Sequence, residues 1–351
     1  MKMTFRWYGP TDPISLEKIK QIPGMTGVVT ALYTIPVGEV WDLESILNLK
    51  KQVNDAGLEM EVIESVPVHE EIKLGSNKRD ALIDNYIQTV KNLSAAGVKV
   101  ICYNFMPVFD WVRSELKYVT ADGSNCLAYD QRTVDNLNPR RQTLSLPGWD
   151  ESYSKEELAG LLERYEAVNE DILFDNMVYF LKKLIPVCEE CDVKMAVHPD
   201  DPPWSLFGLP RIITSEAQID KLFAAVDSPY NGITLCTGSL GASRDNDLVA
   251  MAEKYAKMGR VHFLHARNIK FNETDDGRLF FNESPHPTEC GSLDMYGILK
   301  ALHDNGFTGY TRPDHGRNIW GEDGKPGYGL YDRALGATYL FGLWEAIEKS
   351  K

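Results

Sequence analysis

Eight short apolar segments, each typical of a β-strand, recur along the chain and are mostly separated by amphipathic helical segments. The strand-like segments span residues 4–8, 27–33, 58–65, 98–105, 193–199, 231–239, 260–268 and 309–316. This alternation predicts parallel strands joined by crossover helices, because a parallel pair needs a long return connection. Eight such units in 351 residues predict a (β/α)8 barrel, the TIM-barrel fold.

A doubly wound open sheet is the alternative architecture for the same alternation. Such sheets usually bind a nucleotide through a Gly-rich turn after the first strand. Here that turn reads "GPTDP", and the chain has neither a GxGxxG motif nor a P-loop. Helical segments end at Gly57 and Gly97, directly before the next strand, as expected of C-terminal caps. We therefore expect the barrel.

One interval departs from the alternation. Residues 106–150 are rich in aromatic residues and proline and show no regular strand or helix periodicity. We expect a lid-like insertion after the fourth barrel strand, on the catalytic face, within a single domain that spans residues 1–351. A long helical segment is expected after it, from about residue 155 to residue 191.

Composition and charge limit the partners of the chain. Its formal net charge of −14 would repel a phosphate backbone, so nucleic acid is not an expected partner. No apolar run is long enough to span a membrane, and the N-terminal residues lack the apolar core of a signal peptide, so a cytoplasmic location is expected. The six cysteines form no dense framework, and we expect reduced thiols.

Metal-binding side chains occur at the ends of four consecutive predicted strands. They are His198, Cys236, His265 and Asp314. Active sites of such barrels lie at the carboxyl ends of the strands, and imidazole, thiolate and carboxylate groups together suit a divalent metal. A single histidine or cysteine on a strand is more often a core residue. His262, which faces the opposite side of its strand from His265, is expected to be one.

Further polar side chains crowd the same end of the predicted barrel. Arginines there favour an acidic substrate, because a guanidinium binds a carboxylate or phosphate through two hydrogen bonds. The absence of a Gly-rich phosphate cradle favours a small acid over a nucleotide, although each arginine can instead form an ion pair at the rim. The predicted substrate-binding residues are Arg6, Trp7, His69, Asn104, Arg267, Asn268 and Arg312.

Longer motifs resemble the mannonate dehydratase family from one end of the chain to the other. They are "FRWYG", "IPVGEVW", "VIESVPVHEEIKLG", "VICYNFMPVFDW", "AVHPDDPP", "TLCTGSLG", "HFLHARN", "GSLDMY", "RPDHGR" and "PGYGLYDRALG". The resemblance implies a xylose-isomerase-like barrel that removes water from D-mannonate and forms 2-dehydro-3-deoxy-D-gluconate in hexuronate (glucuronate) breakdown. It also implies a divalent metal, Mn2+ or Fe2+, held by the same four residues: His198, Cys236, His265 and Asp314.

The resemblance also indicates His315 and Tyr328 as the residues that transfer protons. His315 follows Asp314 directly, and a turn at residues 314–316 can bring both side chains into the site. Tyr328 lies in a loop rich in glycine and proline that can fold over the barrel mouth, and Tyr331 is a weaker substitute. Which of His315 and Tyr328 is the base and which is the acid stays open.

Other functions fit the same barrel less well. A metal-dependent sugar isomerase or epimerase would use a similar metal site but release no water. A two-metal hydrolase would need a second cluster of carboxylates, which the sequence does not offer. A binding module without activity would not need so many polar side chains at the carboxyl ends of its strands. We also expect a homo-oligomer, because barrels of this type often associate through their outer helices or insertions.

Overall fold

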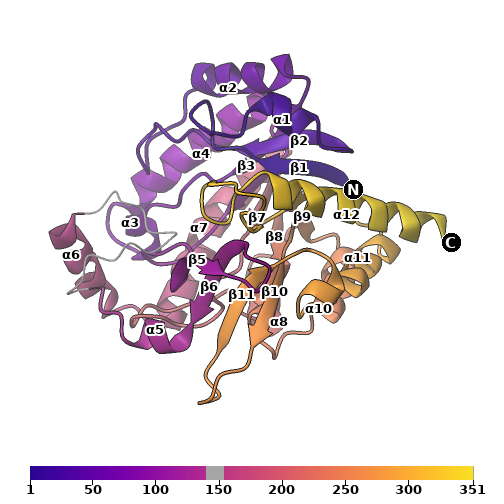
Figure 1. Ribbon diagram of the computed structural model, residues 1–351. Helices are drawn as coiled ribbons and strands as arrows, with labels where there is room; N and C mark the ends of the chain where they lie inside the picture. Colours follow the sequence, from indigo (N-terminus) through magenta and orange to yellow (C-terminus); the bar gives the residue numbers. More distant parts are fainter. Residues whose placement is uncertain (140–153, 351) are drawn as a thin grey trace.

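A closed barrel of eight parallel strands forms the centre of the protein (Figure 1). The computed structural model describes residues 1–139 and 154–350, so the predicted insertion is described only as far as residue 139. The barrel strands are β1 (Lys2–Arg6), β2 (Met25–Thr30), β3 (Glu59–Glu64), β4 (Val100–Tyr103), β7 (Lys194–Val197), β8 (Asn231–Cys236), β9 (Val261–Ala266) and β12 (Tyr310–Pro313). Because β12 pairs in parallel with β1, the sheet closes, and the predicted (β/α)8 fold is confirmed.

Helices alternate with the barrel strands along the chain. They are α1 (Leu16–Lys20), α2 (Leu43–Asp55), α3 (Glu70–Lys73), α4 (Arg79–Ala95), α5 (Gln131–Asp135), α6 (Lys155–Tyr165), α7 (Glu170–Cys191), α8 (Glu216–Ala225), α9 (Thr237–Gly241), α10 (Leu248–Lys257), α11 (Met295–Asp304) and α12 (Tyr331–Lys349). A 3-10 turn covers Thr288–Cys290. Among the described residues, no helix combines the length and the apolar character needed to cross a membrane.

The predicted long helix over residues 155–191 is two helices in the structure. The chain turns between α6 and α7, where Asn169 caps the start of α7. Its side-chain oxygen accepts a hydrogen bond from the backbone N–H of Ile172 at 2.9 Å, which favours a new helix start over continuation. The single-helix prediction was therefore wrong at this turn.

The barrel interior below the strand ends is filled by apolar side chains. They are Val29, Val62, Val100, Cys102, Ala196, Phe263 and Tyr310, all buried. Such a layer makes the barrel a packed core and not a pore. The polar side chains at the carboxyl ends of the strands therefore lie directly above a layer of packed apolar side chains.

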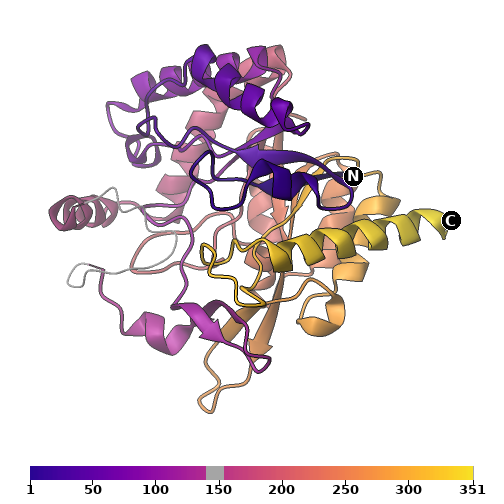
Figure 2. The ribbon, with the colours of Figure 1, turned by 45° about the horizontal axis from the view of Figure 1, so that its top comes forward.

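The inserted segment contains two strands that the sequence analysis did not predict. β5 (Glu115–Val119) and β6 (Asn125–Asp130) join β10 (Asn268–Asn272) and β11 (Phe280–Ser284) in an antiparallel sheet of order β10-β11-β6-β5. Figures 1 and 2 both show the two hairpins side by side at one end of the molecule. The second hairpin follows β9, so this sheet pairs segments that lie far apart in the sequence, which local periodicity does not reveal.

Glycines end the helices before β3 and β4, as predicted. Gly57 and Gly97 have φ of 74° and 82°, in the left-handed region that glycine adopts without strain. The backbone N–H of Gly97 donates to the carbonyl of Ser94 at 2.7 Å, which closes the last turn of α4. These turns direct the chain from each helix into the next barrel strand.

The turn at Gly97 gives a test of this account of the fold. We expect Gly97→Ala to lower the free energy of unfolding by about 1 kcal/mol, because the left-handed backbone strains an alanine. Gly160→Ala is the control: it lies inside α6, and its added Cβ meets no atom within 4 Å. There, the better helix propensity of alanine should raise stability by about 0.5–1 kcal/mol. Urea unfolding measures both, and a neutral Gly97→Ala would contradict the account.

Candidate active site

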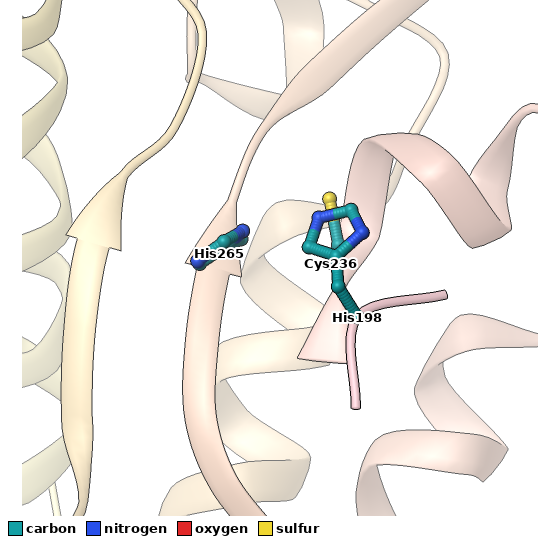
Figure 3. A group of neighbouring side chains, drawn as sticks. All are labelled: His198, Cys236 and His265. Atoms are coloured by element: carbon teal, nitrogen blue, oxygen red, sulfur yellow. The ribbon is translucent and has the colours of Figure 1, made fainter. Parts of the chain in front are cut away.

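Three side chains from separate barrel strands meet at the carboxyl end of the barrel. His198 directly follows β7, Cys236 ends β8, and His265 lies near the end of β9. One ligand atom from each lies within 4.8 Å of the others, and Figure 3 shows the three side chains at the ends of their strands. Cys236 and His265 are direct partners in the strand register. The barrel therefore brings together three of the four predicted metal ligands.

Asp314, the fourth predicted ligand, lies against this group. The Cys236 thiol donates a hydrogen bond to its Oδ2 at 3.5 Å, and its Oδ1 is 3.9 Å from Nδ1 of His265. Burial alone would raise the pKa of Asp314, but the charge of Arg312 lowers it well below its usual value. Asp314 is therefore a carboxylate at neutral pH and offers charged oxygen atoms to a cation.

The protonation states of the histidines suit a metal. Burial, opposed by nearby carboxylates, lowers the pKa of His198, and burial together with the charge of Arg312 lowers the pKa of His265 to about 4. Both rings are therefore neutral at pH 7, as metal binding requires. Nδ1 of His198 lies 2.7 Å from the carbonyl of Pro199, which accepts its hydrogen and leaves Nε2 free as a ligand.

The remaining donor atoms also fit a divalent metal. Burial, the largest effect, raises the pKa of the Cys236 thiol to about 12, and a coordinated metal would remove its proton. Nε2 of His265 is 3.2 Å from Oε2 of Glu64, and Oδ1 of Asp314 is 2.7 Å from Nη2 of Arg312. A carboxylate oxygen has more than one lone pair, so Asp314 can pair with Arg312 and still bind a cation. The site thus fits a transition metal with mixed nitrogen, sulfur and oxygen ligands.

A second possible group shares His265 with Glu64 and Cys102. Cys102 belongs to the apolar layer inside the barrel, below the strand ends. The carboxylate of Glu64 is already paired with Arg312 at 3.0 Å and with Arg6 at 3.3 Å. The upper group, with His198 and Cys236, is therefore the better candidate.

The two predicted proton-transfer residues are in direct contact. Nε2 of His315 lies 3.1 Å from the hydroxyl of Tyr328. Burial raises the pKa of Tyr328, and the charge of Asp314 raises it further, so this hydroxyl carries its proton at neutral pH. Tyr331 is 43% exposed, and its ring packs beside that of Trp320. The structure thus brings Tyr328, and not Tyr331, to His315.

The three predicted arginines are buried and paired with carboxylates. Arg6 and Arg312 both contact Glu64, and Arg267 contacts Asp201 at 3.0 Å. These are ion pairs within the site and not at its rim. Nε of Arg6, Nη2 of Arg267, and Nε and Nη1 of Arg312 form no hydrogen bond among the described residues and are not the nitrogens of these ion pairs. Donors for an acidic substrate are therefore still present.

His69 and Asn268, predicted to bind substrate, are used in local structure. Nδ1 of His69 accepts a hydrogen bond from the backbone of Glu71 at 3.0 Å and caps α3. The side chain of Asn268 donates to the carbonyl of Pro287 at 2.9 Å and accepts from the backbone of Leu293 at 3.1 Å. These side chains hold loops in place, which sequence position alone did not reveal.

Trp7 and Asn104 lie where predicted, directly after β1 and β4. Trp7 is 4% exposed and belongs to the main hydrophobic core. The side-chain oxygen of Asn104 accepts a hydrogen bond from the backbone of Met106 at 3.1 Å. These contacts place Trp7 in the core and Asn104 in the turn that follows β4, and their part in substrate binding stays a prediction.

A network of buried carboxylates and an arginine lies behind His315 and was not predicted from the sequence. Glu283 on β11 lies 3.1 Å from Nδ1 of His315, and Arg113 of the inserted segment pairs with Glu283 at 3.2 Å and with Asp201 at 2.7 Å. Asp201 was visible in the "HPDDPP" motif. Glu283 and Arg113 lie in segments that carry no recognised pattern, so no local signal pointed to them.

Comparison with known proteins identifies the family. The D-mannonate dehydratase (UxuA) family model matches residues 1–351. This chain belongs to the mannonate dehydratase family. The mannonate dehydratase of Thermotoga petrophila is 56% identical over 361 residues, which cover 100% of this chain and 99% of the relative.

Solved structures agree with this membership and with the fold. The crystal structure of mannonate dehydratase from Streptococcus suis serotype 2 is 48% identical, with a TM-score of 0.91, and covers 100% of this chain and 94% of that chain. A xylose isomerase-like TIM barrel protein from Mycobacterium smegmatis has a TM-score of 0.59 at 13% identity, covering 95% of this chain and 87% of that chain. The second likeness shows the fold alone and confirms the xylose-isomerase-like barrel of this mannonate dehydratase family member.

Removing the thiol tests the choice between the two ligand groups. We expect Cys236→Ala to lower the affinity for Mn2+ about tenfold or more, by analogy with the losses seen when metal sites are disturbed. Cys102→Ala is the matched control, because the same atom is removed from the lower group, and Mn2+ binding should change little. Elemental analysis after dialysis against a set Mn2+ concentration measures both. Loss of metal from Cys102→Ala alone would reverse the assignment.

Proposed function

We propose that this chain dehydrates D-mannonate to 2-dehydro-3-deoxy-D-gluconate and water. Membership of the mannonate dehydratase family over the full length supports this proposal. The structural observation that carries it is the contact between His315 and Tyr328. His315 directly follows Asp314, which lies beside the His198–Cys236–His265 group. A hydro-lyase needs such a combination, since it must both stabilise negative charge and transfer protons.

We propose further that His198, Cys236, His265 and Asp314 hold a divalent metal, Mn2+ or Fe2+. The neutral imidazoles, the closeness of the three ligand atoms and the ionised carboxylate of Asp314 support this set. When bound, such a metal would polarise the substrate carboxylate and a neighbouring hydroxyl and so make the C2 proton more acidic.

The residues of the chain itself would supply the remaining chemistry. The reaction removes a proton from C2 and expels the hydroxyl of C3, so it needs one group that accepts a proton and one that donates a proton. His315 and Tyr328, 3.1 Å apart, are the candidates for these two tasks. The unpaired nitrogens of Arg6, Arg267 and Arg312 would orient the acid and its hydroxyls.

The segment 106–150 would act as an inserted cover within a single domain. Its described part supports this role: the ring of Trp111 lies 5.2 Å from that of His315, and Arg113 is paired with Asp201. Residues 140–150 lie outside the described ranges. An apolar ring and a paired cation beside His315 would exclude water from the reacting groups.

The substrate class of this proposal is a small sugar acid, in hexuronate breakdown. The cytoplasmic location and the homo-oligomeric state stay predictions.

A product assay tests the proposed reaction. The protein is purified without oxygen, loaded with Mn2+ and incubated with D-mannonate, and the 2-keto-3-deoxy acid is measured. We expect product only when metal is present, with none after EDTA treatment. Conversion of D-mannonate to an isomer, without loss of water, would instead favour the alternative function, a sugar isomerase or epimerase.

Replacing His315 tests its part in proton transfer. We expect His315→Asn to lower kcat by about a hundredfold or more while the metal stays bound, because asparagine cannot exchange a proton near neutral pH. His303→Asn is the matched control, since His303 lies on α11 against Trp344 and should leave kcat unchanged. Near-normal turnover by His315→Asn would remove His315 from the proposed mechanism.

A further inference from the structure

Glu283 is a buried carboxylate that directly contacts a proposed proton-transfer residue. It lies on β11, in the hairpin that follows β9, and its side chain is 0% exposed. Its Oε1 is 3.1 Å from Nδ1 of His315 and 3.2 Å from Arg113, and its Oε2 is 3.3 Å from Arg267. A completely buried carboxylate is costly, so its contacts indicate what it stabilises.

From this geometry we propose that Glu283 is a positioning residue: it accepts a hydrogen bond from Nδ1 of His315, so that Nε2 of His315 accepts a hydrogen bond from the hydroxyl of Tyr328. This inference rests on the proposed function, because it assigns a direction to the His315–Tyr328 pair that the dehydration needs. It names His315, and not Tyr328, as the hydrogen-bond acceptor of the pair before substrate binds.

The charge on Glu283 supports this direction. Burial alone would raise its pKa, but the charge of Arg267 lowers the pKa below its usual value. An ionised carboxylate only accepts hydrogen bonds. The 3.1 Å contact therefore places a hydrogen on Nδ1, and in a neutral ring the lone pair is then on Nε2.

The hydroxyl of Tyr328 completes the arrangement on the other side of the ring. It lies 3.1 Å from Nε2, and its raised pKa keeps it protonated. Tyr328 is therefore the donor and Nε2 of His315 the acceptor. In this hydrogen-bond series, His315 donates to Glu283 through Nδ1, and Tyr328 donates to His315 at Nε2.

One contact opposes the tautomer with the hydrogen on Nδ1. Nη1 of Arg267 lies 3.4 Å from the same Nδ1, and an arginine can only donate. That nitrogen has a shorter contact, at 3.0 Å, with Oδ2 of Asp201. The carboxylate of Glu283 is also closer to Nδ1 than the arginine is. The geometry thus favours Glu283 as the partner of His315.

Nitrogen NMR of the folded protein reads the tautomer directly. The protein carries 15N-labelled histidine and Zn2+, a diamagnetic ion that accepts nitrogen and sulfur ligands. His315→Asn identifies the His315 signals by their loss. We expect a protonated Nδ1 and an unprotonated Nε2. A protonated Nε2 with a bare Nδ1 would overturn the inference, whatever the variants do.

Two isosteric variants separate positioning from packing. Glu283→Gln leaves one acceptor oxygen for Arg113, Arg267 and Nδ1 of His315 and adds an amide donor, so we expect the tautomer to shift. We also expect kcat to fall about a hundredfold or more, with KM changed much less and metal retained. Asp201→Asn disturbs the same arginines, Arg113 and Arg267, but should leave the tautomer of His315 as it was. An unchanged tautomer and kcat in Glu283→Gln would contradict the inference.

These readouts also distinguish the inference from the proposed function. The tautomer is measured without D-mannonate, so a failure to dehydrate it would refute the proposed reaction but leave the NMR result standing. Dehydration of D-mannonate by a protein whose His315 carries its hydrogen on Nε2 would refute only the role of Glu283.

Discussion

The site depends on the register of the parallel strands around the barrel. Cys236 is paired with His265, and His265 with Arg312, so the ends of β8, β9 and β12 lie at one level. Side chains alternate between the two faces of a strand, and a slip of one residue would turn His265 away from the barrel axis. The apolar layer that includes Phe263 fills the interior below and opposes such a slip. The same strand register is therefore required both for packing of the core and for assembly of the site.

Buried charged side chains surround the group of His198, Cys236 and His265. Arg312 pairs with Asp314 at 2.7 Å and with Glu64 at 3.0 Å, while Arg267 is paired with Asp201. Burying ions costs solvation energy that their attraction often does not recover, so these pairs are weak evidence for stability. They hold donors and carboxylates in fixed positions, which is what preorganised stabilisation of developing charge requires. The cost is better explained by function than by folding.

The barrel and the meeting of His198, Cys236 and His265 could be predicted from the sequence because each strand carries its own signal. An apolar run that ends in His198 or Cys236 is a local pattern, and the fold then determines which ends meet. Glu283 could not be found in this way, since its contact with His315 requires the pairing of β11 with β6 of the inserted segment. The cap that His69 forms on α3 could not be predicted, because position near a strand end does not determine where a side chain forms its hydrogen bonds.

Crystallography with anomalous scattering tests whether the four strand ends hold one metal. A crystal of the Mn2+-loaded protein, measured at the manganese absorption edge, locates the ion independently of any assumed ligands. We expect a single strong anomalous peak bounded by His198, Cys236, His265 and Asp314. A peak among Glu64, Cys102 and His265, or one without contact to Cys236, would contradict this expectation.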